Sequence, residues 1–153
     1  MKLAMDALRF ETDAALKEST IPALRSSGFK GSMPHFRRPS AVGVDLLTFQ
    51  FDKWGGGFVV EIGRSAPDGY TTHWGMHIPP SKVTAHDLHP SQRFRIQAAP
   101  GGGTDSWFRF DQAQVGVVAQ QVVAALADAE RWWQRAAPAA SFAGLPEDGT
   151  PIN

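Results

Sequence analysis

The sequence predicts an α+β fold in which an antiparallel sheet of about four to six strands is covered on one face by an N-terminal and a C-terminal helix. Two observations predict the sheet: side chains alternate along residues 42–52 and 58–63, and a glycine-rich turn separates these segments. Apolar residues that recur every three or four positions predict helices at both ends. We therefore expect a single α+β domain over residues 1–137. Residues 138–153 should form a tail that is loose or docked on the surface.

The first helix is expected over about residues 4–26. Its buried stripe should consist of Leu3, Ala7, Phe10, Ala14, Ile21 and Leu24. Pro22 lacks the N–H that would bond back to the preceding turn, so the helix should kink there or restart with Ser19 or Thr20 as its cap. Gly28 should then end the helix in a left-handed conformation.

The long segment 42–52 should form a central strand, because it is apolar on both faces. Alternation turns one set of side chains to one face and another set to the other: Val42, Val44 and Leu46 against Leu47, Phe49 and Phe51. Residues 58–63 resume the alternation after the turn, which predicts an antiparallel hairpin. A weaker strand is expected over residues 35–37.

The segment 64–92 has no sustained period, so it is either functional or contains a short strand near residues 71–78. A second hairpin is expected from residues 93–97 and 106–110, around a glycine-rich tip. Asp111 should cap the last helix. The buried stripe of that helix should consist of Val115, Val118, Val122, Ala125, Ala129 and Trp132.

The composition narrows the classes of function. Lys plus Arg equals Asp plus Glu at 15 each, so no net field draws the protein to nucleic acid or to an anionic membrane. Cysteine is absent, which excludes disulfides, cysteine nucleophiles and cysteine zinc sites. No apolar run approaches the ~18 residues of a membrane span, and the N-terminus lacks the apolar region of a signal peptide. We therefore expect a cytoplasmic protein.

A series of short motifs is typical of one known family. They are Leu24, Gly28-Phe29-Lys30, Phe36-Arg37-Arg38, Phe49-Gln50, the strand from Gly57 to Gly63, Arg93, Arg95-Ile96 and Trp107. In this order, over about residues 10–133, the chain resembles the bacterial family catalogued as domain of unknown function 4304. The resemblance implies a small domain without an established activity, of a kind that accompanies toxin genes and is regarded as an immunity protein.

Five residues are candidates for binding a partner protein: Trp54, Trp74, Arg93, Arg95 and Glu61. Both tryptophans lie in expected connections, where an indole either anchors the loop or contacts a partner. Arg93 and Arg95 share a strand face. Together with Arg37, Arg38 and Arg64 they are either a guanidinium patch for carboxylates or phosphates, or ordinary charges on edge strands.

Carboxylates on the sheet are candidates for acid–base chemistry. Glu61 lies on the strand face opposite Phe58, and Asp45 is on the preceding strand. A pair of carboxylates on one face could act as general acid and base. Alternation does not bring these two together unless a bulge intervenes, so a solvated sheet face is the favoured interpretation.

Four of the five histidines lie in the irregular segment: His73, His77, His86 and His89. Imidazoles are common zinc ligands, so these four are candidates for a metal site, and the alternative is that they are solvated loop residues bonded to backbone carbonyls. We expect a non-enzymatic protein-binding domain without a cofactor. In its sharpest form it is an immunity protein that neutralises a toxin encoded by an adjacent gene. The alternatives are a small metal-dependent enzyme that uses the loop histidines, and a nucleic-acid-binding module.

Overall fold

The computed structural model describes residues 2–98 and 106–136 and confirms the α+β fold. The helical elements are α1 (Lys2–Ala15), the π-helical turn η1 (Leu16–Thr20), α2 (Ile21–Ser26), the 3₁₀ turns η2 (Ala85–Asp87) and η3 (Pro90–Gln92), and α3 (Val115–Arg135). The strands are β1 (Lys30–Ser32), β2 (His35–Ser40), β3 (Gly43–Phe51), β4 (Gly57–Ser65), β5 (Tyr70–Thr71), β6 (His77–Ile78), β7 (Arg93–Arg95) and β8 (Phe108–Arg109). Within the described part, no helix combines the length and the apolar character needed to cross a membrane.

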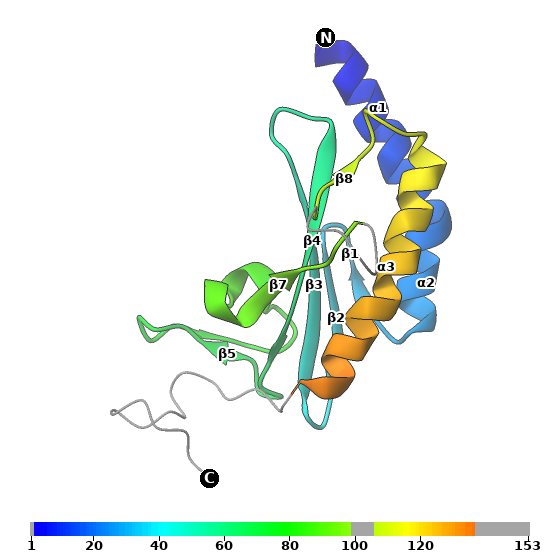
Figure 1. Cartoon of the computed structure of the whole chain (residues 1–153). Helices are drawn as coiled ribbons and strands as arrows, with labels where there is room; N and C mark the ends of the chain where they lie inside the picture. Colours follow the sequence, from blue (N-terminus) through cyan, green and yellow to red (C-terminus); the bar gives the residue numbers. More distant parts are fainter. Residues whose placement is uncertain (1, 99–105, 137–153) are drawn as a thin grey trace.

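The main sheet is antiparallel and has six strands in the order β1-β2-β3-β4-β7, with β8 also paired to β4. Helices α1, α2 and α3 lie together on one side of this sheet, and β5 lies on the other side (Figure 1). The second hairpin expected from the sequence is wrong for the described residues. Strands β7 and β8 both pair with β4, at Glu61–Gly63 and at Gly57–Phe58, and not with each other. The expected glycine-rich tip and the tail 138–153 lie outside the described residues.

The N-terminal helical region runs from α1 through η1 into α2 without a restart. Pro22 lies at the second position of α2. The helix was expected to kink or restart near this proline, and it instead widens into the π-helical turn η1 just before it. The expected cap is wrong, because Thr20 donates its hydroxyl to the carbonyl of Ala119 on α3 and Ser19 donates to Ala15. Gly28 ends α2 at φ +96° as expected.

The predicted buried stripe of the first helix is wrong in α1 and confirmed in α2, where Ile21 and Leu24 are buried. Ala7, Phe10 and Ala14 are exposed, and the Phe10 side chain has 76% of its surface open to solvent. The helix packs on α3 through a second stripe that includes Leu8, Thr12 and Leu16. Both stripes have helical spacing, so periodicity could not decide which one faces the core.

Helix α3 covers the sheet with the expected stripe, apart from its last member. Trp133, and not Trp132, is buried, and its indole Nε1 donates to the carbonyl of Gly63 at 3.0 Å. The expected cap at Asp111 is wrong, because the helix begins at Val115 after Gln114.

The sheet face opposite the helices, for which the sequence predicted no covering helix, is partly covered. The covering layer is the segment that showed no period in the sequence, and it folds as the β5–β6 hairpin followed by η2 and η3. Gly63 allows this layer to approach, because a Cβ at this position would lie 2.4 Å from Leu88 Cδ1. A second apolar core forms there from Val44, Leu46, Tyr70, Val83, Ala85 and Leu88.

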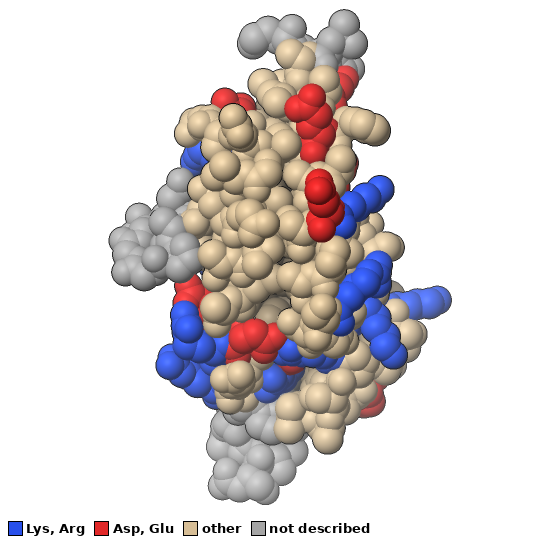
Figure 2. Space-filling view, turned by 90° about the vertical axis from the view of Figure 1, so that its right-hand side faces the viewer, with Lys and Arg blue, Asp and Glu red and all other residues tan. Residues whose placement is uncertain are grey.

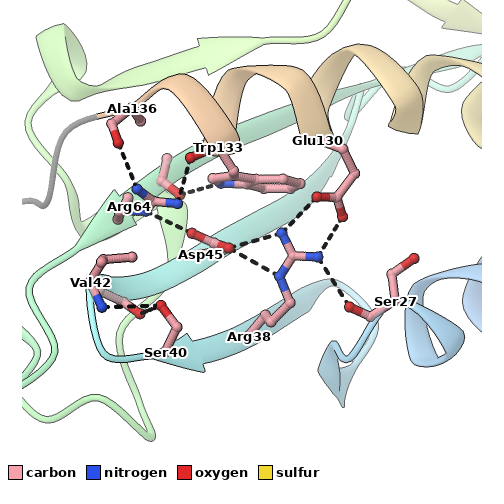
Figure 3. Close-up of polar contacts among 11 residues, drawn as sticks. Ser27, Arg38, Ser40, Val42, Asp45, Arg64, Glu130, Trp133 and Ala136 are labelled. Carbon is pink, nitrogen blue, oxygen red and sulfur yellow. Dashed lines mark hydrogen bonds and ion pairs between the residues drawn. The ribbon is translucent and has the colours of Figure 1, made fainter.

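An ion-pair network joins the helix face of the sheet to α3; it is buried at Asp45 and Arg64 and partly exposed at Arg38 and Glu130 (Figure 3). Asp45 accepts from Arg64 Nε at 2.8 Å and from Arg38 Nε at 3.0 Å. Arg38 continues to Glu130 on α3, at 2.9 Å between Nη2 and Oε2. Burial alone would lower the pKa of Arg38, but the hydrogen bonds to Glu130 and Asp45 outweigh burial and raise it.

Candidate functional site

A row of polar side chains crosses four strands on the face opposite the helices. The strand register places His35 opposite Thr48, Thr48 opposite Glu61, and Glu61 opposite Arg95. His35 Nδ1 and Thr48 Oγ1 lie 2.9 Å apart. Polar residues are unusual in the middle of a sheet that carries an apolar core on each face. This row is therefore where we place the candidate site.

Glu61 is the centre of a group of cations. Its side chain is only 9% exposed, and its carboxylate oxygens lie 3.4 Å from Arg93 Nε, 3.9 Å from Arg95 Nε and 3.7 Å from His86 Nε2. These separations are those of ion pairs, and they are longer than charge-assisted hydrogen bonds. The guanidinium N–H groups can therefore also donate to an incoming acceptor. We call Glu61, Arg93, Arg95, His86 and His35 the Glu61 cluster.

Hydrogen bonds from arginine side chains to backbone carbonyls hold the covering segment over this cluster. Arg37 donates to the carbonyls of Val83 and Lys82, at 2.5 Å from Nε and 3.0 Å from Nη2. Arg93 Nη1 donates to the carbonyl of His86 at 3.4 Å. Two arginines of the sheet thus hold η2 and the residues before it, and this places the imidazole of His86 near Glu61.

The electrostatics of the cluster favour a neutral His35. Burial lowers the pKa of His35, and the neighbouring charges of His86 and Arg37 lower it further, against a smaller opposite effect of Asp87. The ring of His35 lies edge-on to that of His86, with 6.1 Å between centroids. Burial also lowers the pKa of Arg37.

A pocket of about 200 Å³ adjoins the cluster between the β5–β6 hairpin and the turns η2 and η3. His86 and Arg93 line it and also contact Glu61, so the pocket and the cluster form one surface. Trp74 stands at its rim with 65% of its surface exposed, and the ring of His73 meets the indole edge-on at 4.7 Å. We call this pocket the Trp74 pocket.

The structure brings together four of the five predicted partner-binding residues. Trp74, Arg93, Arg95 and Glu61 lie around the Trp74 pocket and the Glu61 cluster. Trp54 lies elsewhere, in the turn between β3 and β4 beside α1. In Figure 1 that turn and β5 are at opposite ends of the sheet.

The predicted guanidinium patch is divided between the two faces of the sheet. Arg37, Arg93 and Arg95 lie on the side of Glu61, whereas Arg38 and Arg64 belong to the buried network around Asp45 on the helix side. The same alternation keeps Asp45 and Glu61 apart, as predicted. Both residues are buried, however, so the favoured interpretation of a solvated sheet face is wrong.

The four loop histidines do not converge on one point. His77 lies between Thr71 Oγ1 and the carbonyl of Asp68, and His89 Nδ1 accepts from the backbone N–H of Ser91. Within residues 2–98 and 106–136, no group of three or more His, Asp or Glu side chains could hold a metal ion.

Sequence reasoning missed His35 and Thr48 as members of the site. The only available signal was their position on predicted strands, since their proximity to Glu61 depends on the register of three strands.

Comparison with known proteins identifies a family and no closer relative. Residues 20–136, more than half of the chain, match the family model described as "Domain of unknown function (DUF4304)". No curated protein and no solved structure matches the chain.

Proposed function

The chain belongs to the DUF4304 family, whose description states no function, and we propose that it acts by binding a partner protein. One observation carries the proposal: the exposed Trp74 lines a pocket together with His86 and Arg93, whose side chains contact a carboxylate that is outnumbered by cations. Tryptophan and arginine dominate the energetics of protein interfaces, because each buries a large area and keeps a hydrogen-bond donor.

The charges of the site favour an acidic partner surface. Arg93 and Arg95 share the single carboxylate of Glu61, and the nearby Asp87 carboxylate accepts from the backbone N–H and hydroxyl of Thr84. The site therefore has guanidinium donors in excess over its own acceptors. A partner Asp or Glu can bind them in the paired geometry that arginine provides.

In its sharpest form, the proposal is that the domain is a cytoplasmic immunity protein and that the partner is a toxin encoded by an adjacent gene. This form of the proposal relies on the family resemblance. In it, the Trp74 pocket and the Glu61 cluster bind the toxin. A protein that blocks a toxin needs only to cover it, so a surface with anchoring residues suffices for the task.

Titration of the purified chain with the product of the adjacent gene tests the proposal. Trp74→Ala should weaken binding by about 2 kcal/mol, which is about 30-fold in Kd. Arg95→Gln should mainly slow association and reduce its dependence on salt. Trp54→Ala is the matched control, because loss of an exposed tryptophan at the other end of the sheet should leave Kd unchanged.

Growth rescue tests the immunity form separately. Co-expression of the chain should restore growth of cells that produce the adjacent gene product, and Trp74→Ala should restore it less well than Trp54→Ala. If that product is harmless, or if it binds only at about millimolar concentration, the immunity form is wrong.

A further inference from the structure

A pocket of about 630 Å³ lies where the end of α3 meets β7 and η3. This volume is within the range of cavities that bind small molecules. Two aromatic side chains, Phe94 and Trp132, line the pocket, and the other lining residues apart from Ala136 are charged or polar. We call it the Trp132 pocket. No described residue lines both this pocket and the Trp74 pocket.

The aromatic part of the pocket is a pair of rings. The ring centroids of Phe94 and Trp132 are 5.1 Å apart, and the ring planes are tilted by 53°. Phe94 lies on the edge strand β7, and 47% of its surface is exposed. Aromatic rings attract one another in tilted and offset contacts, so the exposed part of Phe94 can pack against the ring of a ligand.

The charged residues that line the pocket leave one cation unbalanced. Arg64 belongs to the network around Asp45, in which two arginines balance two carboxylates. Arg131 is paired with Asp128. Arg135 has no ion-pair partner within the described part of the chain. Figure 2 shows that most Lys and Arg side chains of the helix-bearing face lie in its lower half, where α3 ends. One unbalanced guanidinium matches a ligand with one negative charge, and a carboxylate fits its paired donors.

The end of α3 does not oppose an anion in this pocket. The last carbonyls of a helix carry a negative partial charge that repels anions when they are free. Here the carbonyls of Trp133 and Ala136 accept from Arg64, at 2.7 Å and 2.9 Å. The carbonyl of Trp132 accepts from the backbone N–H of Ala136. These hydrogen bonds offset the partial charge of the helix end.

Gln92 supplies a neutral hydrogen-bond donor. Its amide oxygen accepts from the hydroxyl of Tyr70 at 2.9 Å, and the Tyr70 oxygen accepts in turn from the backbone N–H of His89. This network identifies which end of the amide carries the oxygen. The nitrogen end has no acceptor among the described residues, so its N–H groups are available to a ligand in the pocket.

We infer that the Trp132 pocket binds a small carboxylic acid with an aromatic body. The ring of the ligand packs against Phe94 and Trp132, and its carboxylate accepts from Arg135 and from the amide of Gln92. The site is independent of the surface proposed to bind a partner protein.

Titration of the full chain with phenylacetate, followed by the NMR signals of the tryptophan indole N–H groups, tests the site. Phenylacetate should bind at about millimolar concentration, the strength expected for a ligand of this size. It should shift the indole signal that is missing from the spectrum of Trp132→Phe. Phenylacetamide has nearly the same shape without the charge, and it should bind about tenfold more weakly.

Variants of Arg135 separate charge from packing. Arg135→Gln should weaken binding of phenylacetate by about tenfold and leave binding of phenylacetamide unchanged, whereas Arg135→Lys should keep most of the affinity for phenylacetate. Arg25→Gln is the matched control, because it removes an exposed arginine in the last turn of another helix, α2. Circular dichroism checks that each variant is folded.

Trp74→Ala should bind phenylacetate as the unmodified chain does, so this inference and the proposed protein binding can fail separately. Three results would overturn the inference. They are equal binding of phenylacetate and phenylacetamide, an Arg135→Gln variant that binds phenylacetate undiminished, and a titration in which the Trp132 indole signal does not move.

Discussion

Asp45 and Arg64 face each other across β3 and β4 and form an ion pair with 2.8 Å between Oδ1 and Nε. Arg64 also donates to the carbonyls of Trp133 and Ala136, so one guanidinium joins the central strands to the end of α3. A cation at this end of a helix also complements the helix dipole. The pair is buried, with 5% of the Asp45 side chain and 7% of the Arg64 side chain exposed.

The first prediction follows from this burial. Asp45→Asn should lower the free energy of unfolding by about 3 to 5 kcal/mol, because it leaves the buried Arg64 without a carboxylate and Arg38 with Glu130 alone. Denaturant melts measure the loss. Asp13→Asn breaks an exposed Arg–Asp pair on α1 and should cost less than about 0.5 kcal/mol. Equal losses in the two variants would show that the Asp45 network does not stabilise the fold.

Gly63 sets the second prediction, because the covering segment packs directly on its Cα. Gly63→Ala should lower the free energy of unfolding by about 1 to 3 kcal/mol, since the new methyl overlaps Leu88. Gly116→Ala is the control: a Cβ there has no neighbour within 4 Å, so alanine should stabilise α3 slightly. If Gly63→Ala leaves the free energy of unfolding unchanged, the covering segment can shift away from the new methyl group without loss of stability.

Local patterns predicted most of the elements and the antiparallel hairpin of β3 and β4, but not the other strand pairings. Alternation identified β3 and β4, and Gly28 marked the end of α2, because each signal lies within a few residues of its effect. The predicted pairing of β7 with β8 was wrong, since strand pairing depends on contacts between segments that are distant in the sequence. The layer over the second sheet face was not foreseen for the same reason: Leu88 meets Gly63 across a long separation in sequence.

Four residues of the candidate site were predicted, but His35, Thr48 and the arrangement of the site were not. Trp74, Arg93, Arg95 and Glu61 were each recognised from residue type and alternation. Their convergence depends on the register of β7 on β4 and on the position of η2, neither of which has a local signal. Trp54 was grouped with them because an exposed indole has the same sequence signal wherever its loop lies.

The third prediction concerns the pH dependence of stability at His35. In the folded chain its pKa is below 6.5, because of burial and the neighbouring His86 and Arg37. As the pH falls through 6.5, the unfolded chain therefore takes up the proton first, and the free energy of unfolding decreases until the pH passes the folded pKa. Above that window His35 makes no pH-dependent contribution.

Denaturant melts at about pH 8 and about pH 5 check this prediction. The unmodified chain should lose more stability on acidification than His35→Asn, which removes the titrating ring and keeps a polar group beside Thr48. An identical loss in both proteins would show that the environment of His35 does not oppose its protonation.

The last prediction concerns the carboxylate at the centre of the Glu61 cluster. Glu61→Gln should destabilise the chain, because Arg93 and Arg95 are left without the negative charge that they share. The loss should be largest at low salt, where repulsion between the guanidiniums is least screened. In a double-mutant cycle, Glu61→Gln combined with Arg95→Gln should be more stable than Glu61→Gln alone, since the second change removes one of the unbalanced cations. Additive losses at every salt concentration would instead mean that Glu61 contributes through packing, and that the cluster does not hold the excess positive charge on which binding of an acidic partner depends.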